Sequence, residues 1–586
     1  KYFALHPEVD IYSVTSEGGL ISVKVTPVPS GHRKVTTKTG ELRGFVRDED
    51  MAPLAPEMNR ERDLSAWLTR IETGLKKVMA GAVFDNIKFG VNQRLPDSEK
   101  PFVETFIDKE TLSLKKPNDS VLTSRLAGLI SYYKAGKPEL VAKVVRDDII
   151  EVEMSDRQLQ EYTVVRNAEI KQEEDESKRA RKKAPVKKGP AAAYEDVMKK
   201  QKGTFKIFSR AACNFVFPEG ISRPRPGDEK GAMAELGTAE EDDEGEKGVI
   251  AEADQDDAPV APVPEGPAAA PEDPYKQAIQ AALSSLKAAG AQSFSKDALQ
   301  IYSPKFQRVI DNLETSRGPA LIYSNFKTLE GLGIFGLALE FQKDYIRLDI
   351  EQRGGRWNLV DDLLLPANIG KKRYISYTGD DDAEKRDLLK HIFNANWAKI
   401  PEHLAAEVKQ INGGSENNIK GEISMLFMIT QSGAEGISLE NVRQVHLMEP
   451  YWNYVRLEQV KGRAIRICSH KSLPPAERTV EVFTYISKFS EGQLRERRVD
   501  QTLMIKDLGV TTDQQILAVS DGKRKLADAL ASAMKNGAVD CELNQTENGA
   551  GIACYRFPAP TMDTLFNPNL AENIIESAAA IRVAAK

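Results

Sequence analysis

The chain has 586 residues, of which 41% are hydrophobic and 29% are charged, and this length allows two or three packed domains joined by linkers. Its formal net charge is −6, so the chain as a whole lacks the basic balance of many nucleic-acid-binding proteins. No apolar run in the sequence approaches the roughly 20 residues that span a bilayer, and we expect a soluble, intracellular protein without a membrane partner.

The cysteine pattern indicates neither a disulfide framework nor a zinc site. Paired Cys-x-x-Cys spacing does not occur, and each cysteine is predicted to be a reduced thiol. We therefore predict no metal site in this chain. The cysteines are Cys213, Cys468, Cys541 and Cys554.

The first third of the chain combines short strands with helices. Residues 1–95 contain alternating strand candidates such as 21–25 and an amphipathic helix candidate at 64–79. Residues 96–218 are predicted to be largely helical, with their densest apolar parts at 125–133 and 210–218. None of these patterns by itself indicates a chemical function.

Residues 219–274 are predicted to be an acidic, disordered linker. They carry the runs 240–244 and 254–257 among Ala, Pro and Gly, a composition that cannot bury enough apolar surface to fold. Without them the rest of the chain is near neutral or basic, so the overall charge does not exclude a nucleic-acid partner. A second polar run, 171–188, fits a solvated tether, or a contact with nucleic acid or an import receptor.

From Ala320 onward, apolar strand-like runs alternate with segments of helical length. This alternation predicts right-handed crossovers and a mostly parallel sheet covered by helices on both faces, which is an α/β fold over residues 275–490. Residues 491–586 are predicted to be a helical tail with a helix near 514–534. The predicted strands are 320–323, 345–350, 374–377, 425–430, 445–448 and 480–486.

The most informative motif is Gln-x-x-Gly-Arg-x-x-Arg at 459–466. If the segment is one helix, Arg463 and Arg466 lie on one face, where always-charged guanidinium groups could neutralise a phosphoryl group in transfer. An arginine pair on a solvated helix fits the motif equally well when it is taken alone. Its neighbours add to it, because the buried strand-like run 424–430 leads into a turn of small residues at 431–439.

This order of strand, Gly-rich turn, strand and arginine helix resembles motifs V and VI of superfamily 2 helicases and translocases. Residues 320–326 (Ala-Leu-Ile-Tyr-Ser-Asn-Phe) are similar to motif IV of the same superfamily. Residues 377–379 (Tyr-Thr-Gly), followed by 384–386 and 393–394, resemble the next motif in order. The resemblance covers about residues 95–545.

Within the superfamily, residues 449–453 (Glu-Pro-Tyr-Trp-Asn) are similar to the Trp-Asn-Pro segment of Swi/Snf-type ATPases, with Tyr454 in the place of the proline. Three further segments look most like the Swi/Snf-like helicases of large nucleocytoplasmic DNA viruses. These segments are 466–470, 122–133 and 205–218.

The resemblance implies a fold and a domain order. Residues 275–490 would form the RecA-like second helicase lobe, whose ligands bind at the carboxyl ends of the strands. Residues 1–95 would be the end of the first lobe or an insert, and residues 96–218 a helical linker and protrusion.

The resemblance also implies ATP and Mg²⁺ as cofactors. Neither a Gly-x-x-x-x-Gly-Lys-[Ser/Thr] phosphate loop nor an Asp-Glu-x-His box occurs in this sequence, which begins with Lys1. We therefore expect the chain to be the C-terminal portion of a longer polypeptide whose N-terminal RecA-like lobe holds the nucleotide and the Mg²⁺ ligands.

Carried over by position, the family's motifs assign three kinds of site residue. Arg466 is the expected arginine finger, with Arg463 beside it. The expected nucleotide contacts are Gln459, Gly433, Glu435, Gly436 and Gly462. The expected nucleic-acid contacts are Ser324, Asn325, Thr378, Gly379, Thr430 and Ser432, through hydroxyl and backbone groups that hold phosphates without reading sequence.

Two side chains near the arginine motif keep alternatives open. Trp452 could stack on a base or anchor the core between sheet and helix. His470 is predicted to be a satisfied surface histidine rather than a ligand.

Two function classes remain open from the sequence. The first is the motor lobe of an ATP-hydrolysing helicase or translocase, whose track by family analogy is duplex DNA. The second is a non-catalytic, helicase-like scaffold of viral transcription or packaging machinery. If the chain is viral, its location would be the infected-cell cytoplasm, the nucleus or the virion.

Overall fold

The computed structural model divides the chain into two compact units, residues 1–134 with 525–586 and residues 135–524. It describes residues 2–6, 9–17, 20–27, 32–36, 42–47, 60–78, 93–108, 111–116, 118–133, 140–183, 206–225, 274–379, 381–431, 436–548, 552–556, 570–571, 573–575 and 577–578. Most of the expected acidic linker, residues 226–273, lies outside the described residues.

The first unit contains short helices and two-stranded sheets. Its elements are α1 (Tyr2–Leu5), β1 (Val9–Glu17), β2 (Leu20–Pro27), β3 (His32–Thr36), β4 (Leu42–Arg47), α2 (Arg60–Val78), α3 (Glu99–Phe106), β5 (Ile107–Asp108), β6 (Ser113–Leu114), α4 (Asn118–Leu126), the end of α21 (Thr512–Asn536) and α22 (Gln545–Asn548).

The second unit contains the large sheet. Its elements are β7 (Lys143–Glu153), α5 (Asp156–Lys183), α7 (Ile207–Asn214), α9 (Pro274–Ala289), α10 (Ala291–Phe294), α11 (Lys296–Tyr302), α12 (Pro304–Leu313), β8 (Ala320–Tyr323), α13 (Leu332–Lys343), β9 (Ile346–Arg347), β10 (Ile350–Arg353), β11 (Arg356–Leu359), α14 (Asp361–Leu364), β12 (Arg373–Tyr377), α15 (Ala383–Phe393), η3 (Trp397–Lys399), α16 (Glu402–Ile411), β13 (Leu426–Ile429), β14 (Gln444–Leu447), α18 (Tyr454–Ala464), η4 (Pro475–Glu477), β15 (Thr479–Lys488), α19 (Glu491–Arg495), α20 (Gln501–Lys506) and the start of α21.

The predicted α/β fold is confirmed by a seven-stranded sheet in the order β7-β15-β14-β8-β13-β12-β9. Every pair of neighbouring strands in it runs parallel. Strands β8, β12, β13, β14 and β15 fall where the sequence predicts strands, within one or two residues at each end. This is the parallel α/β sheet that the resemblance leads us to expect for the second lobe.

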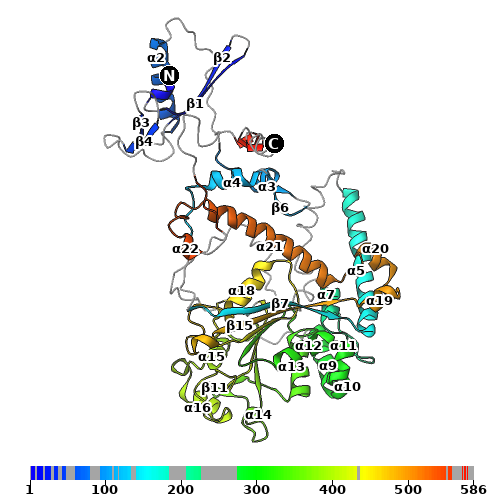
Figure 1. Ribbon diagram of the computed structural model, residues 1–586. Coiled ribbons are helices and arrows are strands. Elements are labelled where there is room, and N and C mark those ends of the chain that lie inside the picture. Colours follow the sequence, from blue (N-terminus) through cyan, green and yellow to red (C-terminus); the bar gives the residue numbers. More distant parts are fainter. Residues whose placement is uncertain are drawn as a thin grey trace, which may run out of the picture. The chain divides into compact units, whose positions relative to one another are not determined.

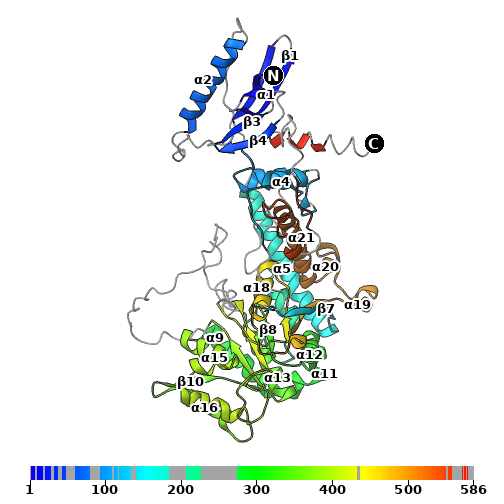
Figure 2. The same cartoon turned by 60° about the vertical axis from the view of Figure 1, so that its left-hand side comes forward.

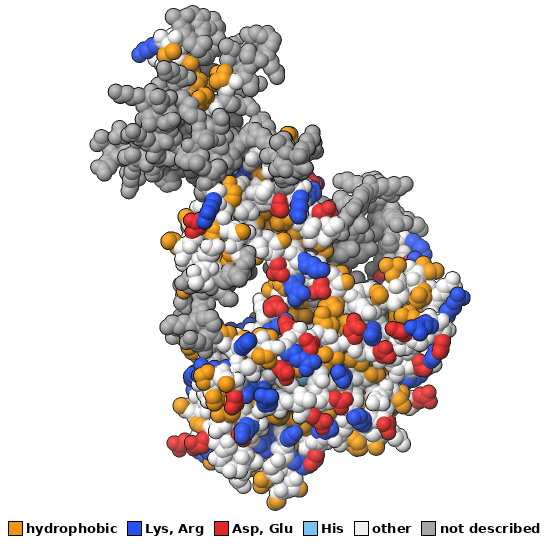
Figure 3. Space-filling view, viewed as in Figure 1, with side chains coloured by type: hydrophobic (Ala, Val, Ile, Leu, Met, Phe, Trp, Pro, Cys, Tyr) orange, Lys and Arg blue, Asp and Glu red, His pale blue; other side chains and the backbone are white. Residues whose placement is uncertain are grey.

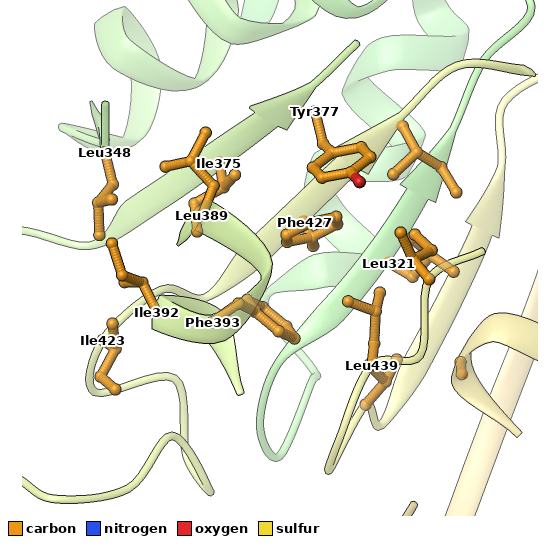
Figure 4. Close-up of a cluster of buried hydrophobic side chains, with 14 of the residues drawn as sticks. Leu321, Leu348, Ile375, Tyr377, Leu389, Ile392, Phe393, Ile423, Phe427 and Leu439 are labelled. Carbon is orange, nitrogen blue, oxygen red and sulfur yellow. The ribbon is translucent and has the colours of Figure 1, made fainter. Parts of the chain in front are cut away.

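The central strands read as continuous apolar runs because both of their faces are buried. Side chains alternate along a strand, so Leu321 and Tyr323 of β8 join one core cluster while Ala320 and Ile322 join the other. Figure 4 shows the first cluster, in which Leu321 and Ile375 lie near Phe427 and the helix residue Phe393.

Helices cover both faces of this sheet. α15, α16 and α18 contribute their apolar side chains to the cluster that contains Leu321, whereas α9, α11, α12 and α13 contribute to the opposite cluster. In Figure 1, α15 and α16 accordingly lie on one side of the sheet and α10 to α13 on the other. Figure 2 shows the same layers after a turn of 60°.

The prediction that residues 96–218 are largely helical is wrong for β7. Residues 143–153 form an edge strand parallel to β15, so part of the sheet comes from the chain well before Ala320. The β-branched residues of this segment favour a strand. Most of its side chains are exposed or half-buried, as at Val145, so it lacks the apolar run by which the other strands are recognised.

A second difference concerns residues 345–350, which the sequence predicts as one strand. Only Ile346 and Arg347 join the sheet, as β9, and Ile350 begins a separate antiparallel hairpin of β10 and β11. Gly354 and Gly355 form its two-residue turn with φ of +57° and +76°. Positive φ at both turn positions matches the twist of a hairpin and favours glycine.

In the first unit, the predicted strand 21–25 lies within β2 and the predicted helix 64–79 is α2. Trp67, Ile71 and Leu75 of α2 lie four residues apart and pack with Phe3 and Val9 in one small core. A spacing of four places such side chains on one face of a helix, which is the amphipathic pattern of the sequence.

The prediction of four reduced thiols is wrong for two of them, because Cys541 and Cys554 form a disulfide. Their Cα atoms are 5.7 Å apart, within the usual range for a bridge. The missed pair does not follow a metal-type spacing, and the turn that brings Cys554 back to the end of α21 cannot be read from the local sequence. Cys213 and Cys468 are free.

The surface of the second unit carries both signs of charge. Lysine and arginine side chains are interspersed with aspartate and glutamate side chains on the face drawn in Figure 3. Among the described residues, no helix is long and apolar enough to cross a membrane. Within the same residues, no group of three or more His, Cys, Asp or Glu side chains could hold a metal ion.

Leu321→Ala should lower the free energy of unfolding of the second unit by about 2–5 kcal/mol, because it leaves a cavity beneath a fully buried strand. We expect this in urea titrations read by hydrogen exchange of the sheet peptides. Leu365→Ala is the matched control, since Leu365 is 50% exposed and should change the free energy by less than about 0.5 kcal/mol. Equal effects would contradict the assigned core.

His446 of β14 should remain neutral far below the usual histidine range. Its Nδ1 accepts from the Tyr485 hydroxyl and its Nε2 donates to Gln444 Oε1, at 2.8 and 3.1 Å. Burial lowers the pKa of His446 to about 3. Because the unfolded chain takes up this proton near pH 6.5, stability falls by about 1.4 kcal/mol per pH unit between there and pH 3.

The ring resonance of His446, assigned with His446→Gln, is expected to stay at its neutral position from pH 7 to about pH 4 in NMR titrations. A midpoint near 6 would contradict the buried, neutral tautomer.

Candidate functional site

The carboxyl ends of four central strands meet at one edge of the sheet. Tyr323 of β8 pairs in register with Ile429 of β13 and with Leu447 of β14, and Ile429 also pairs with Tyr377 of β12. The residues that follow these strands are therefore brought together, as the order of motifs predicts.

The motif after β8 lies below the surface. Ser324 and Asn325 are 0% and 2% exposed, and their polar atoms are directed at Glu449, which follows β14. Ser324 Oγ donates to both Glu449 carboxylate oxygens at 3.0 and 3.2 Å, and Asn325 donates its backbone N–H and its side-chain Nδ2. In this structure the two side chains are not available to a phosphate, which departs from the contact expected for them.

The other expected nucleic-acid contacts differ in their exposure. Gly379 is exposed and Thr378 is 8% exposed at the end of β12, whereas Thr430 is fully buried after β13. Ser432 lies outside the described residues, as do Gly433 and Glu435.

Gly436 closes the described part of the turn after β13. It is exposed and has a φ of +71°, a conformation that favours glycine because a Cβ strains it. A Cβ built there would meet no atom within 4 Å. The backbone conformation thus favours glycine at this position, while packing among the described residues does not require it.

The arginine helix α18 begins where the sequence predicts it. Asn453 is its N-cap, and the Asn453 side chain accepts the Val455 N–H at 3.1 Å. One turn on, Arg456 donates to the Gln431 side chain and lies 4.3 Å above the Tyr451 ring. The first turn of the helix is thereby tied to the turn after β13.

The prediction that both motif arginines lie on one helix is wrong, because α18 ends at Ala464. Arg463 lies in its last turn and Arg466 lies beyond it. The helix stops because its last carbonyl groups find other donors: Leu439 N–H donates to Arg463 O at 3.0 Å, and Ser469 Oγ donates to Ala464 O at 3.1 Å.

Arg466 is nevertheless held against the turn that follows β13. Its Nη1 donates to Ser438 Oγ at 2.6 Å, and most of its side chain is exposed. Together with the Leu439–Arg463 bond, this contact joins two motifs that lie far apart in the sequence. An exposed guanidinium is a group that can donate hydrogen bonds to anionic oxygens.

Two further motif residues lie on α18. Gln459 is exposed and precedes Arg463 by one helical turn, so the two share a face. Gly462 is inside the helix, where glycine costs roughly 1 kcal/mol relative to alanine. A Cβ at Gly462 would meet no atom within 4 Å, so packing among the described residues does not require this glycine.

Trp452 and His470 are both integrated into the fold. Trp452 is half-buried against the core, and Lys523 Nζ of α21 lies 4.6 Å from the centre of its ring, which favours the anchor over the base-stacking alternative. His470 is buried rather than on the surface: its Nε2 donates to Val442 O at 2.7 Å, and its Nδ1 pairs with Ser469 Oγ at 2.8 Å.

Polar residues beneath the strand ends were not among the predicted site residues. Glu449 is 1% exposed, and burial raises the pKa of its carboxyl. Asn214 at the end of α7 donates to it at 3.0 Å and accepts from Lys305 Nζ at 2.9 Å. Lys305 in turn pairs with Asp513 at 2.6 Å. The sequence gives little signal for them, since the four residues lie on four separate segments and only Asn214 and Glu449 stand next to apolar runs.

A family model described as the helicase conserved C-terminal domain matches residues 357–468. A protein of Acanthamoeba polyphaga mimivirus, named as an ATP-dependent RNA helicase, is 26% identical over 79% of this chain and 52% of its own length. The termination factor NPH-I homolog of African swine fever virus is 29% identical over 46% of this chain and 36% of its own length. A second mimivirus protein named as an ATP-dependent RNA helicase is 41% identical over 15% of this chain and 19% of its own length.

Among solved structures, the C-terminal part of the Fun30 ATPase domain aligns with 65% of this chain and 96% of its own length, at 15% identity and a TM-score of 0.29. The chain spans between about a third and a half of the length of the two larger viral relatives. The matched family model covers the segments after β12, β13 and β14 and the arginine motif, and it begins after the segment that follows β8. The chain therefore contains a helicase conserved C-terminal domain and is similar to viral proteins named as helicases and as a termination factor homolog.

Proposed function

We propose that this chain forms the second motor lobe of an ATP-hydrolysing nucleic-acid translocase. The observation that carries the proposal is the contact between the turn after β13 and the end of α18. In it, the exposed Arg466 donates to Ser438, and the Leu439 N–H donates to Arg463 O. In phosphoryl transfer, charge builds up on the transferred group and must be neutralised from outside it.

In this proposal, Arg466 is the finger and Ser438 orients it through their hydrogen bond. A guanidinium needs no deprotonated partner and can donate two parallel hydrogen bonds to phosphate oxygens. Arg463 supports the same surface from the last turn of α18, and Gln459 lies one turn before it. Gly433, Glu435, Gly436 and Gly462 complete the proposed nucleotide side.

ATP with Mg²⁺ is the proposed cofactor, and its phosphate loop and metal ligands belong to the first RecA-like lobe of a longer protein. When bound, ATP supplies the phosphoryl group, and this lobe supplies positive charge to it.

The proposed track is nucleic acid, and duplex DNA by analogy with the Swi/Snf-type family. Thr378, Gly379 and Ser432 are the proposed contacts with its phosphates. Ser324, Asn325 and Thr430 would act from below, because their burial suits them to shape the strand ends rather than to touch the track. Viral transcription proteins are proposed as further partners.

Arg466→Ala should lower kcat for ATP hydrolysis by at least about 10³-fold while leaving nucleotide binding largely intact, because the finger acts in the transition state. The measurement is nucleic-acid-stimulated ATPase of the complete protein. Arg495→Ala is the control, since Arg495 is exposed on α19 and paired only with Glu491 among described carboxylates. A fall of about tenfold or less would move the finger to Arg463.

The isolated chain should not hydrolyse ATP at all, and joining it to a first lobe should restore turnover. No stimulation by any lobe or nucleic acid would favour a non-catalytic scaffold of viral transcription or packaging machinery.

Thr378→Ala with Ser432→Ala should weaken nucleic-acid binding to a similar degree for all sequences. Phosphate contacts add affinity without sequence preference, and the binding should fall steeply with salt. Stimulated ATPase should fall more than basal ATPase. If basal turnover were lost with binding intact, both residues would belong to the nucleotide side instead.

A further inference from the structure

Below the strand ends, four hydrogen-bond donors hold the Glu449 carboxylate. They are Ser324 Oγ, whose one proton lies between the two carboxylate oxygens, the backbone N–H and side-chain Nδ2 of Asn325, and Asn214 Nδ2. A carboxylate that is 1% exposed can keep its charge only if such donors replace water.

Asn214 connects this carboxylate to a buried ion pair, that of Lys305 and Asp513. Its Nδ2 bonds Glu449 Oε2 and Glu330 O, both at 3.0 Å, while its Oδ1 accepts from Lys305 Nζ at 2.9 Å. Lys305 also donates to Asp513 Oδ2 at 2.6 Å, and the same oxygen accepts the Ser487 N–H at 2.9 Å. The chain Glu449–Asn214–Lys305–Asp513 thus runs from the end of β14 to the first turn of α21.

All four members of this chain are buried to 1% exposure or less. Buried ion pairs contribute little net stability, because desolvation offsets most of their attraction. Each member nevertheless needs its partner in one place, since a buried charge without its partner is strongly destabilising. These four hydrogen-bonded residues therefore fix the relative positions of the segments on which they lie.

The segment that this geometry fixes is the loop 449–453, which leads directly into α18. The ring of Tyr451 in the loop is close to two guanidinium groups, those of Arg210 and Arg456, at 5.6 and 4.3 Å from its ring centre. Trp452 lies under Lys523, which follows Asp513 on the same helix. Helix α21 therefore acts on the loop at two points, through Asp513 and through Lys523.

We propose that Glu449 is a positioning residue for the arginine segment and that the Glu449–Asn214–Lys305–Asp513 chain lets α21 set where α18 begins. The proposal deepens the proposed motor function and rests on it for its kinetic part. A small displacement of the loop would be carried along α18 to Arg463 and to the turn that holds Arg466.

The test replaces Glu449 by Gln in the longest natural polypeptide that contains this chain. The substitution keeps the size of the side chain but sets an amide among donors. Stimulated kcat should fall about 10- to 100-fold with the KM for ATP unchanged, as expected when a catalytic group is misplaced while the groups that bind ATP stay in position. Glu449→Asp, which keeps the charge, should recover part of the rate.

A second readout follows the loop itself. With 5-fluorotryptophan, this chain contributes four fluorine resonances to the spectrum of the longer polypeptide, from Trp67, Trp357, Trp397 and Trp452. Trp452→Phe assigns the Trp452 resonance. Glu449→Gln should shift the Trp452 resonance beyond its line width and leave the other tryptophan resonances in place as internal controls.

Glu491→Gln is the matched control, because Glu491 is an exposed carboxylate paired with the exposed Arg495, and it should change neither readout. Ser324→Ala removes one donor to Glu449 and gives a milder variant if Glu449→Gln does not fold. It should move both readouts in the same direction by a smaller amount.

Three outcomes would overturn the proposal: an unchanged Trp452 resonance with reduced kcat, a shifted resonance with unchanged kcat, or no change in either. If the unmodified protein shows no ATPase with any nucleic acid, the motor function fails, but the resonance of Trp452 still reports whether Glu449 positions the loop. The two failures are therefore distinguishable.

Discussion

The in-register parallel pairing of β8, β12, β13 and β14 is the constraint on which the site depends. Because these strands end at one level, whatever follows each of them meets whatever follows its neighbours. Thr378, Thr430 and Glu449 are brought together in this way. A slip of one residue in any strand would also turn its apolar side chains to the wrong face, so two buried faces hold the site in register.

Buried charged residues lie close to the carboxyl ends of these strands, which is unusual for the interior of a protein. Lys305, Glu449 and Asp513 are almost fully buried just below strands whose faces are apolar. Apolar residues of similar volume are often at least as good for stability as a buried ion pair. The buried polar residues are therefore best explained as fixing one arrangement of the loop before α18. A functional site needs such a fixed arrangement, whereas a hydrophobic core does not need polar residues for it.

The sequence is most informative where local pattern and burial agree. The central strands were predictable because Leu321 and its neighbours are apolar on both faces. Strand β7 was not predictable, because its exposed edge residues look like those of a polar helix and its partner β15 lies more than three hundred residues later. Two other features were not predicted for a related reason: the disulfide between Cys541 and Cys554 and the contacts of Glu449. Each depends on contact between segments that no local sequence pattern specifies.

The end of α18 shows how tertiary contacts override a local pattern at the site itself. Spacing alone places Arg463 and Arg466 on one helical face, but the Leu439 N–H and the Ser469 hydroxyl take the carbonyl groups that a longer helix would need. The two arginines are consequently positioned by different segments. Arg463 follows α18, and Arg466 follows the turn after β13 through Ser438. If that turn moved relative to the helix, the distance between the two guanidinium groups would change. The spacing of the two positive charges therefore depends on the positions of both segments.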